Sequence, residues 1–235
     1  MEGNAVAEYP GVLAVDVGGS NVKLRVAGNP ERRRFKSGPE LTPTQMVEGV
    51  LAAAEGWTWE HVSVGIPTPV HGGKVIAEPV NLGEGWVGFD FEAAFGKPTK
   101  VVNDAVMQAV GSYEGGRMLF LGLGTGLGSA LIADGVIEPL ELGHLPYKDK
   151  TFEDYVEKSA LKEVGHAKWQ KRVFEVVDRL ASAMEPDYVV IGGGGVKDLT
   201  ELPPNARRGD NQLAFLGGFR LWEPQWQPKT SQSEV

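Results

Sequence analysis

The chain of 235 residues contains no cysteine. This absence excludes disulfides, thiolate catalysis and any zinc site built on cysteine. The chain also lacks an apolar run approaching the roughly 20 residues needed to cross a bilayer. Its first ten residues do not have the basic-then-apolar order of a signal peptide. We therefore expect a soluble, cytoplasmic protein without a membrane partner.

Basic residues are the scarcer charge, since 23 lysines and arginines stand against 31 aspartates and glutamates, for a formal net charge of −8. This balance argues against nucleic acid as a partner, because a phosphate backbone calls for a basic face. A hydrophobic content of 42% and a charged content of 23% are typical of a globular chain. The length allows one large domain or two small lobes.

Glycine is abundant, and it concentrates in two similar turns. The stretch 16–23 (DVGGSNVK) has a degenerate echo about half a chain later, at 122–129 (GLGTGLGS). Each stretch lies between two apolar runs, which predicts a strand, a turn and a second strand in each half. Glycine lets backbone N–H groups come close to an anion, so two such turns on opposite walls of one cleft could hold a chain of phosphates. Taken singly, each could be an ordinary glycine-rich hairpin.

Short runs rich in valine, isoleucine and leucine predict strands at 12–15, 22–26, 61–65, 99–102, 118–121, 129–132 and 188–191. Helices are predicted between them at 42–55, 90–95, 105–113 and 212–221, with two more inside 152–184 that separate near Gly165. Strands that alternate with helices indicate a layered α/β fold. The polar tail 223–235 is expected to be mobile.

One predicted strand ends at Asn103 and Asp104, where a helix begins. Ligands of open α/β sheets bind at the carboxyl ends of strands. A carboxylate at this position could therefore accept the proton of a substrate hydroxyl as it attacks a phosphoryl group. Both residue types also cap helices, and taken alone the pair fits a cap at least as well.

A second polar cluster follows at Glu141-Leu142-Gly143-His144 and at Glu153. Carboxylates and imidazole are the groups that hydrogen-bond vicinal hydroxyls, so the cluster suits a polyol ligand. A solvated acidic loop is the alternative. No set of histidines or cysteines with metal-ligand spacing surrounds His144, which argues against zinc.

Three further segments have two interpretations each. The strand 188–191 runs into four glycines at 192–195, which could receive a flat ligand or form only a flexible turn. The loop around Asn81 and Trp86 could close over a small ligand, or Trp86 could cover the core. The basic runs 32–36 and 207–208 could line a groove for a long anionic polymer, although a solvated charged hairpin is the simpler interpretation.

Together these motifs resemble the ROK group of sugar kinases, within the actin, Hsp70 and hexokinase superfamily, and the chain looks closest to the bacterial polyphosphate/ATP glucokinases. The resemblance covers about 12–221. It implies an α/β, two-lobed actin-like ATPase fold of the ribonuclease H-like type, with duplicated lobes around a central cleft. The N-terminal lobe would span 10–103, the C-terminal lobe 104–222 and the tail 223–235.

The resemblance also assigns roles to individual residues. The phosphate and nucleotide would be bound by Asp16, Gly18, Gly19, Ser20, Lys23, Gly124, Thr125, Gly126, Gly192, Gly193 and Gly194. The sugar would be bound by Asn81, Asn103, Asp104, Glu141, His144 and Glu153. Within these sets, Asp104 matches the family's catalytic base, and Asp16 is the expected protein partner of Mg²⁺.

The sequence departs from the family's pattern in three informative places. The zinc-binding cysteines of the family are missing, as they are in its polyphosphate-using branch, so no zinc is expected. Phe152-Glu153-Asp154-Tyr155 stands where the family has Leu-Glu-Ala-Tyr, and Ser20 replaces the commoner threonine while keeping a hydroxyl.

The implied activity is transfer of a phosphoryl group from ATP or polyphosphate, with Mg²⁺, to a small-molecule hexose, glucose at its 6-hydroxyl being the expected acceptor. Mannose, fructose or an N-acetylhexosamine could replace glucose, since the motifs contact hydroxyls that several sugars share. A catalytically silent sugar-sensing module is the alternative from another functional class. The family suggests a homodimer.

Overall fold

The computed structural model describes Tyr9, residues 11–210 and residues 212–226. The strands of the N-terminal half that form its main sheet are β1 (Val12–Val17), β2 (Asn21–Val26), β3 (Arg33–Lys36), β4 (His61–Ile66) and β7 (Thr99–Asn103). Those of the C-terminal half are β8 (Arg117–Leu123), β9 (Leu127–Ala133), β10 (Val136–Leu140), β13 (Tyr188–Gly192) and β14 (Ala206–Arg208). Two small hairpins pair β5 (Val70–His71) with β6 (Lys74–Val75) and β11 (Pro146–Tyr147) with β12 (Lys150–Thr151).

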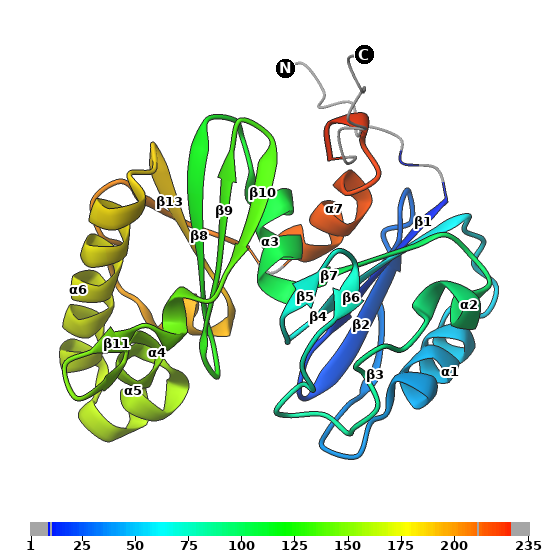
Figure 1. Cartoon of the computed structure of the whole chain (residues 1–235), viewed down its shortest axis with the longest axis horizontal. Helices are drawn as coiled ribbons and strands as arrows, with labels where there is room; N and C mark the ends of the chain where they lie inside the picture. The colour runs from blue at the N-terminus through cyan, green and yellow to red at the C-terminus, as the bar shows by residue number, and fades with distance from the viewer. Residues whose placement is uncertain (1–8, 10, 211, 227–235) are drawn as a thin grey trace, which may run out of the picture.

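The two main sheets have the same topology, in the orders β3-β2-β1-β4-β7 and β10-β9-β8-β13-β14 (Figure 1). In each sheet the three strands that come first in the chain form an antiparallel meander, β1-β2-β3 and β8-β9-β10. The other two strands run parallel to the central strand, which is β1 in one sheet and β8 in the other. The predicted duplication of one lobe in two halves of the chain is therefore confirmed.

The helices are α1 (Pro43–Ala53), α2 (Phe91–Phe95), α3 (Asp104–Ser112), α4 (Phe152–Val156), α5 (Lys158–Val164), α6 (His166–Met184) and α7 (Leu213–Arg220). The stretch 152–184 thus contains three helices, and the prediction of two was wrong. A helix ends at Gly165, as predicted, and this glycine has a φ of 75°. A helix also ends at Glu157, whose backbone is extended. Glu157 carries no sequence signal for a break.

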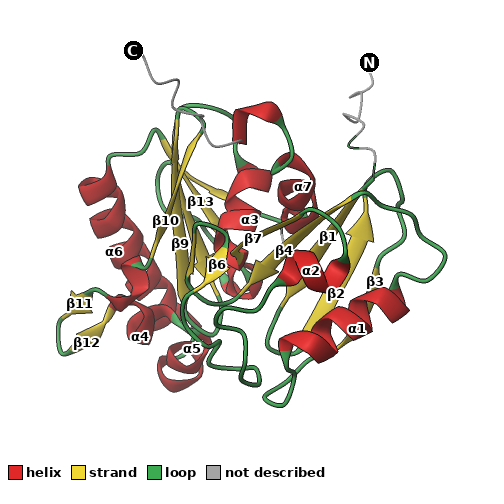
Figure 2. Cartoon of the chain, turned by 45° about the vertical axis from the view of Figure 1, so that its right-hand side comes forward, coloured by secondary structure: helices red, strands yellow, loops and turns green. Residues whose placement is uncertain are grey.

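Each sheet has its own core on its outer face. Helix α1 packs Met46 and Val50 against Leu13 and Leu24 of the N-terminal sheet. Helix α6 packs against the outer face of the C-terminal sheet through the apolar side of its 3.6-residue repeat, including Trp169. Helices α3 and α7 lie between the two sheets (Figures 1 and 2).

Helices α3 and α7 cross with their backbones in contact. A Cβ atom on Gly217 would lie 1.7 Å from the carbonyl oxygen of Met107, and one on Gly111 would lie 1.9 Å from that of Leu213. On the N-terminal sheet, a Cβ atom on Gly218 would lie 2.7 Å from the Cβ of Ala14. Larger residues would separate these elements, so glycine is what lets the helix pair join the two lobes closely.

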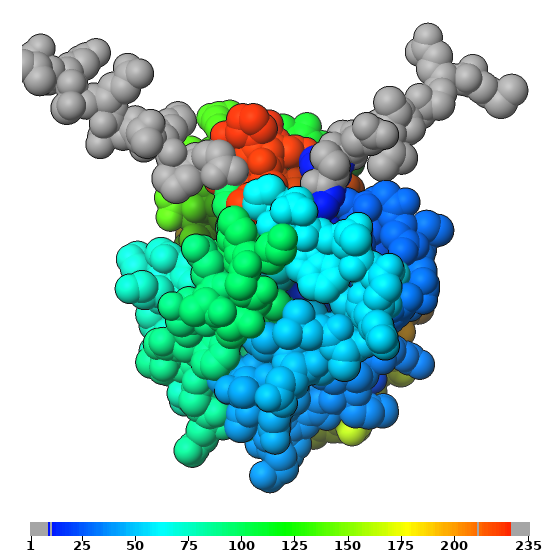
Figure 3. Space-filling view, turned by 90° about the vertical axis from the view of Figure 1, so that its right-hand side faces the viewer, coloured from blue at the N-terminus to red at the C-terminus, as the bar shows by residue number. Residues whose placement is uncertain are grey.

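The chain end folds back on the N-terminal lobe. Phe215 and Phe219 pack against Val12 of β1, and Trp226, in a short 3₁₀ turn, is buried. Figure 3 shows this C-terminal segment in red at the top of the N-terminal lobe. Residues 227–235 of the predicted tail lie outside the described residues. Among the described helices, none has the length and apolarity to cross a membrane.

Candidate active site

The carboxyl ends of three parallel strands bring Asp16 and Asn103 to one edge of the N-terminal sheet. Asp16 of β1 is in register with Gly65 of β4, and Ile66 of β4 is in register with Asn103 of β7. Asn103 caps helix α3, because its Oδ1 accepts the N–H of Ala105 at 2.8 Å. Its amide also donates to the carbonyl oxygen of Thr68 at 3.1 Å. The capping alternative therefore holds for Asn103.

Asp104 is the first residue of α3 and lies half-buried beside this edge. Its Oδ1 accepts the N–H of Ala105 at 2.8 Å, while no described residue bonds its Oδ2. Burial raises the pKa of Asp104 to about 7, and the negative charges of Asp16 and Glu141 raise it further in the same direction. The free oxygen thus belongs to a carboxylate that can take up a proton near neutral pH.

Two glycines, one from each sheet, hold the start of α3. A Cβ atom on Gly65 of β4 would lie 3.5 Å from the Cα of Asp104 and 2.7 Å from the side chain of Met107. A Cβ atom on Gly128 of β9 would lie 2.9 Å from the Cβ of Ala105. We did not expect Gly65 to matter; a lone glycine inside a strand is the signal that points to such a close approach.

The first glycine turn is held by polar side chains of its own lobe. Lys23 on β2 forms an ion pair with Asp16 at 2.9 Å, with the lysine side chain 44% exposed and the carboxylate 14%. The hydroxyl of Ser37 donates to the carbonyl oxygen of Gly18. Asn81 lies against the turn, since a Cβ atom on Gly19 would be 3.1 Å from its Cβ. The loop predicted to contact the sugar is therefore beside the first phosphate turn.

The second glycine turn is held from the other side, by residues near helix α4. Within the turn, the N–H of Gly124 donates to the carbonyl oxygen of Gly126 at 3.0 Å. The carbonyl oxygen of Gly124 accepts the N–H of Lys158 at 3.0 Å. Glu153 accepts the N–H of Leu127 through Oε2 at 3.3 Å. Thr125, which completes the turn, makes no side-chain hydrogen bond within the described part of the chain.

The four-glycine segment lies directly beside this second turn. Gly192, the last residue of β13, is in register with Gly122 of β8. Gly193 has a φ of 78°, and a Cβ atom on it would lie 2.2 Å from the carbonyl oxygen of Leu123. By contrast, a Cβ atom on Gly194 would meet no atom within 4 Å. At Gly194 the segment therefore presents open backbone next to the second glycine turn.

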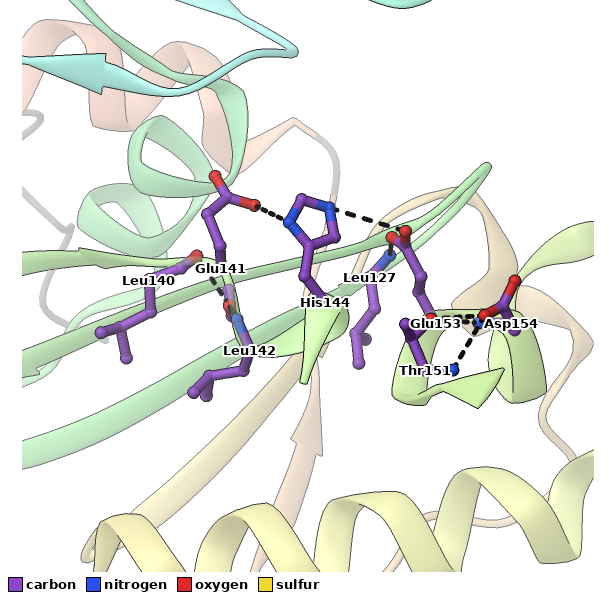
Figure 4. A network of polar contacts seen from close by, with 9 residues as sticks. Leu127, Leu140, Glu141, Leu142, His144, Thr151, Glu153 and Asp154 are labelled. Carbon is purple, nitrogen blue, oxygen red and sulfur yellow. Dashed lines mark hydrogen bonds and ion pairs between the residues drawn. The ribbon is translucent and has the colours of Figure 1, made fainter. Parts of the chain in front are cut away.

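The predicted sugar-binding residues Glu141, His144 and Glu153 come together around the imidazole (Figure 4). Nδ1 of His144 lies 3.9 Å from Oε2 of Glu141, and Nε2 lies 3.6 Å from Oε1 of Glu153. Burial raises the pKa of Glu141, and the charge of Glu153 acts in the same direction against the effect of His144. The three side chains form a polar cluster on the C-terminal lobe, and the charge of one of them, Glu141, helps raise the pKa of Asp104.

Glu153 is placed by a capping box at the start of α4 (Figure 4). The backbone N–H and the hydroxyl of Thr151 donate to Oδ2 of Asp154, at 2.9 and 2.6 Å. Tyr147 and Phe152 stack beneath, with ring centroids 4.7 Å apart. We missed Thr151 and Asp154, although a threonine followed three residues later by an acid is a known signature of a helix start.

Metal-binding residues are sparse in this site. The described residues contain no group of three or more histidines, aspartates or glutamates that could hold a metal ion by themselves. Mg²⁺, however, commonly uses one or two carboxylates together with waters and substrate phosphates. Asp16, beside the first phosphate turn and paired with a lysine that could equally neutralise a phosphate, fits that partial role.

The basic pair Arg207 and Arg208 on β14 is already engaged. Arg208 donates to the carbonyl oxygens of Val196 and Leu199, the second at 3.0 Å. Arg207 pairs with Glu114 and lines a cavity of about 680 Å³ at the C-terminal end of α3, away from Asp104.

Sequence comparison relates the chain to known kinases. No family model matches it. The polyphosphate glucokinase of Mycobacterium tuberculosis is 26% identical over 223 residues, covering 82% of this chain and 83% of that protein. The polyphosphate glucokinase of Mycobacterium leprae is 27% identical over 207 residues, covering 77% of this chain and 63% of that protein.

Solved structures show the same fold. The inorganic polyphosphate/ATP-glucomannokinase of Arthrobacter sp. has a TM-score of 0.78 at 23% identity, covering 89% of this chain and 97% of that one. The ROK family glucokinase of Streptomyces griseus, solved with glucose and AMPPNP, has a TM-score of 0.70 at 17% identity, covering 89% and 98%. The predicted resemblance is therefore confirmed: the chain has the two-lobed, actin-like fold of the ROK sugar kinases and is similar in sequence to the polyphosphate glucokinases, which are phosphotransferases.

Proposed function

We propose that this protein is a hexose kinase that transfers a phosphoryl group from ATP or inorganic polyphosphate to the 6-hydroxyl of glucose, with Asp104 as general base. The observation that carries the proposal is the position and pKa of Asp104, about 7, between Asp16 beside the first glycine turn and Glu141 of the sugar cluster. A base works best when its pKa lies near the working pH, because it is then both ionised and basic enough.

The chemistry follows from what surrounds Asp104. A sugar hydroxyl near its free Oδ2 would lose its proton to that oxygen while the hydroxyl oxygen forms its bond to the donor's terminal phosphorus. The bond from that phosphorus to the bridging oxygen would break, and the donor, shorter by one phosphate, would leave with the bridging oxygen and its electron pair. Burial and the like negative charge of Asp16 keep the pKa of Asp104 high, so the carboxylate stays basic. Glu141, His144 and Glu153 offer acceptors and a donor for the remaining hydroxyls. Their positions orient the acceptor, which is where much of the rate enhancement of phosphoryl transfer arises.

The two glycine turns would bind the donor through backbone N–H groups, which suit phosphoryl oxygens that gain charge during transfer. Ser20 and Thr125 add a hydroxyl to each turn. Of the predicted nucleotide-binding glycines Gly192, Gly193 and Gly194, the first two pack closely and Gly194 leaves open space where a flat base could lie beside the second turn. Asp16 would hold Mg²⁺ beside the donor's phosphates, directly or through water, and Lys23 would neutralise part of the phosphate charge.

A coupled kinase assay tests the proposal. Purified protein is given glucose, mannose, fructose or N-acetylglucosamine with Mg²⁺ and either ATP or polyphosphate, and product formation is measured. We expect turnover with glucose. Mannose is the second sugar to examine, because one structural relative is a glucomannokinase by name. Silence on every pair, from protein that still binds glucose in a calorimeter, would favour the sensing module and leave Asp104 as part of a helix cap.

A further inference from the structure

One face of the N-terminal sheet carries a row of cations. The alternation of β2 buries Val22, Leu24 and Val26 against the α1 side and turns Lys23 and Arg25 to the opposite side. Lys23 is in register with Arg34 of β3, and Asn21 with Lys36. Because facing residues of paired strands share a face, Lys23, Arg25, Arg34 and Lys36 lie on one face of the two strands. Arg32, which directly precedes β3 and is two positions from Arg34, completes what we call the basic row.

The same face is covered over β1 but open over β2 and β3. Phe215 and Phe219 of α7 pack on Val12 and Ala14 of β1. Figures 1 and 2 show α7 near β1 and β4, with β3 at the far edge of the sheet. The row of cations therefore lies on the uncovered half of this face.

The outer cations of the row have no partners. Arg32, Arg34 and Lys36 are exposed, and none of them forms a hydrogen bond, ion pair or ring contact with another described residue. Their neighbour Arg33 points to the other face, where it pairs with Glu31 at 2.8 Å and covers Trp57 at 4.2 Å. A structural role thus accounts for Arg33 and for none of the other three.

The charge distribution makes this row unusual for the chain. The protein as a whole has a net charge of −8, yet neither β2 nor β3 contains an acidic residue. Charges of one sign gathered on one face raise the local concentration of the opposite charge. Self-repulsion among these side chains is a cost that binding an anion would relieve.

The row leads to the first phosphate turn. At its inner end Lys23 pairs with Asp16 at 2.9 Å. Ser37 follows Lys36. Its backbone N–H donates to the carbonyl oxygen of Ser20 at 3.3 Å, and its hydroxyl donates to the carbonyl oxygen of Gly18. From Lys36 to Arg33 strand β3 spans about 10 Å, at about 3.3 Å per residue, and Arg32 precedes it directly. An extended ligand with evenly repeated negative charge could follow this path into the turn.

We propose that Arg32, Arg34 and Lys36 form a track for the distal part of an inorganic polyphosphate chain whose end occupies the first glycine turn. The track rests on the proposed function, since it supplies the donor to that same site. The track should affect the binding of long polyphosphate and not that of ATP. The adenosine of ATP carries no negative charge that Arg32, Arg34 and Lys36 could bind. Arg207 and Arg208 do not offer the same surface, since carbonyl oxygens and Glu114 already bind them.

The test replaces the three outer cations together, as Arg32→Gln, Arg34→Gln and Lys36→Gln. A matched control replaces three exposed lysines of the C-terminal lobe, as Lys162→Gln, Lys168→Gln and Lys171→Gln. Both variants lose three positive charges. For each protein, binding of long-chain polyphosphate is measured by calorimetry without sugar, and KM is measured with glucose for long-chain polyphosphate, tripolyphosphate and ATP.

We expect the track variant to bind long-chain polyphosphate about tenfold or more weakly, with a shallower dependence of affinity on salt concentration, because fewer counterions are released. Its KM for ATP and tripolyphosphate should stay within about twofold of the wild type, and the control should match the wild type throughout. Equal losses in the track and control variants would overturn the track and leave only general charge attraction. ATP-dependent turnover without any use or binding of polyphosphate would overturn the track while leaving the kinase intact.

Discussion

The two glycine turns have the same backbone setting but different anchors. Both connect the first two strands of topologically identical sheets. The first turn is held by Lys23 and Ser37, which lie at the end of the basic row of the N-terminal lobe. The second is held by Glu153, which also belongs to the sugar cluster. Duplication thus preserved the turn, and the residues around it diverged.

Under the proposed function, this difference predicts separate effects when each turn is disturbed. Disturbing the first should affect the phosphoryl donor alone. Disturbing the second should affect the sugar as well, because Glu153 is shared between Leu127 of the turn and His144. The start of helix α3 is contacted by both lobes, through Gly65 of one and Gly128 of the other. A change there should affect donor and sugar together.

The largest effect should come from Asp104, which both lobes surround. We expect Asp104→Asn to lower kcat by at least about 100-fold, because an amide cannot accept the hydroxyl proton. The asparagine can keep the 2.8 Å hydrogen bond to Ala105, so the helix start should remain intact. Steady-state kinetics with saturating glucose and donor measure the change, and near-normal turnover would remove Asp104 from the mechanism.

The stability of the same variant supplies a control. The folded-state pKa of Asp104, about 7, lies above the ordinary value of 3.8. The folded protein therefore holds this proton more tightly than the unfolded chain, and wild-type stability should fall as the pH rises from about 4 to about 7. Asp104→Asn is neutral throughout, so its Tm advantage over the wild type should grow across that range and then level off. A constant difference in Tm would mean that the carboxylate has an ordinary pKa.

The pH dependence of the reaction should show the same group. Only ionised Asp104 can accept a proton, so kcat/KM for glucose should rise with pH through about 7 and reach a plateau above it. At pH 6 the value should be about tenfold below the plateau. A limb near pH 4, where carboxylates ordinarily titrate, would contradict the effect of burial and of Asp16.

The sequence predicted the fold well where apolar runs are buried and poorly at the sheet edges. All seven predicted strands were confirmed. The missed strands of the main sheets, β3, β10 and β14, are all edge strands. Strands β3 and β14 have the sequences Arg-Arg-Phe-Lys and Ala-Arg-Arg, and the apolar start of β10 is interrupted by Glu138 and Pro139. Edge strands tolerate charge because one side is unpaired, so they lack the apolar pattern on which the prediction depends.

The candidate site was predictable as a set of motifs but not as a set of contacts. Asp104 and Asn103 are adjacent in sequence, yet only the packing of α3 shows that Asn103 caps the helix while an oxygen of Asp104 stays free. The link from Glu153 to Leu127 spans 26 positions and depends on where α4 begins. Such long-range contacts leave no periodic trace in one sequence.

A pair of glycines in the second turn can separate the donor from the sugar. A Cβ atom on Gly126 would lie 2.7 Å from Oε2 of Glu153, whereas one on Gly124 would meet nothing within 4 Å. Gly126→Ala should displace the carboxylate and weaken glucose binding about tenfold, the cost of about one charge-assisted hydrogen bond. Calorimetry with glucose and no donor measures this loss directly.

Gly124→Ala is the matched control for that experiment. It changes the same turn by the same methyl group, and it should leave glucose affinity unchanged even where donor kinetics alter. Equal glucose affinity in both variants would show that Glu153 is not shared between the sugar and the turn. A change in either glycine turn would then leave glucose affinity unaffected.

The smallest effect should come from the matching experiment on the first turn. Ser37→Ala removes the hydroxyl that donates to the carbonyl oxygen of Gly18, while the backbone bond from Ser37 to Ser20 remains. A single neutral hydrogen bond of about 0.7 kcal/mol corresponds to about a threefold rise in KM for the donor. Glucose affinity should not change, because none of the residues that anchor this turn belongs to the cluster around His144. If glucose affinity fell together with donor affinity, the two turns would be coupled through the closure of the lobes rather than anchored separately, and Glu153 would no longer be needed to explain the link between donor and sugar.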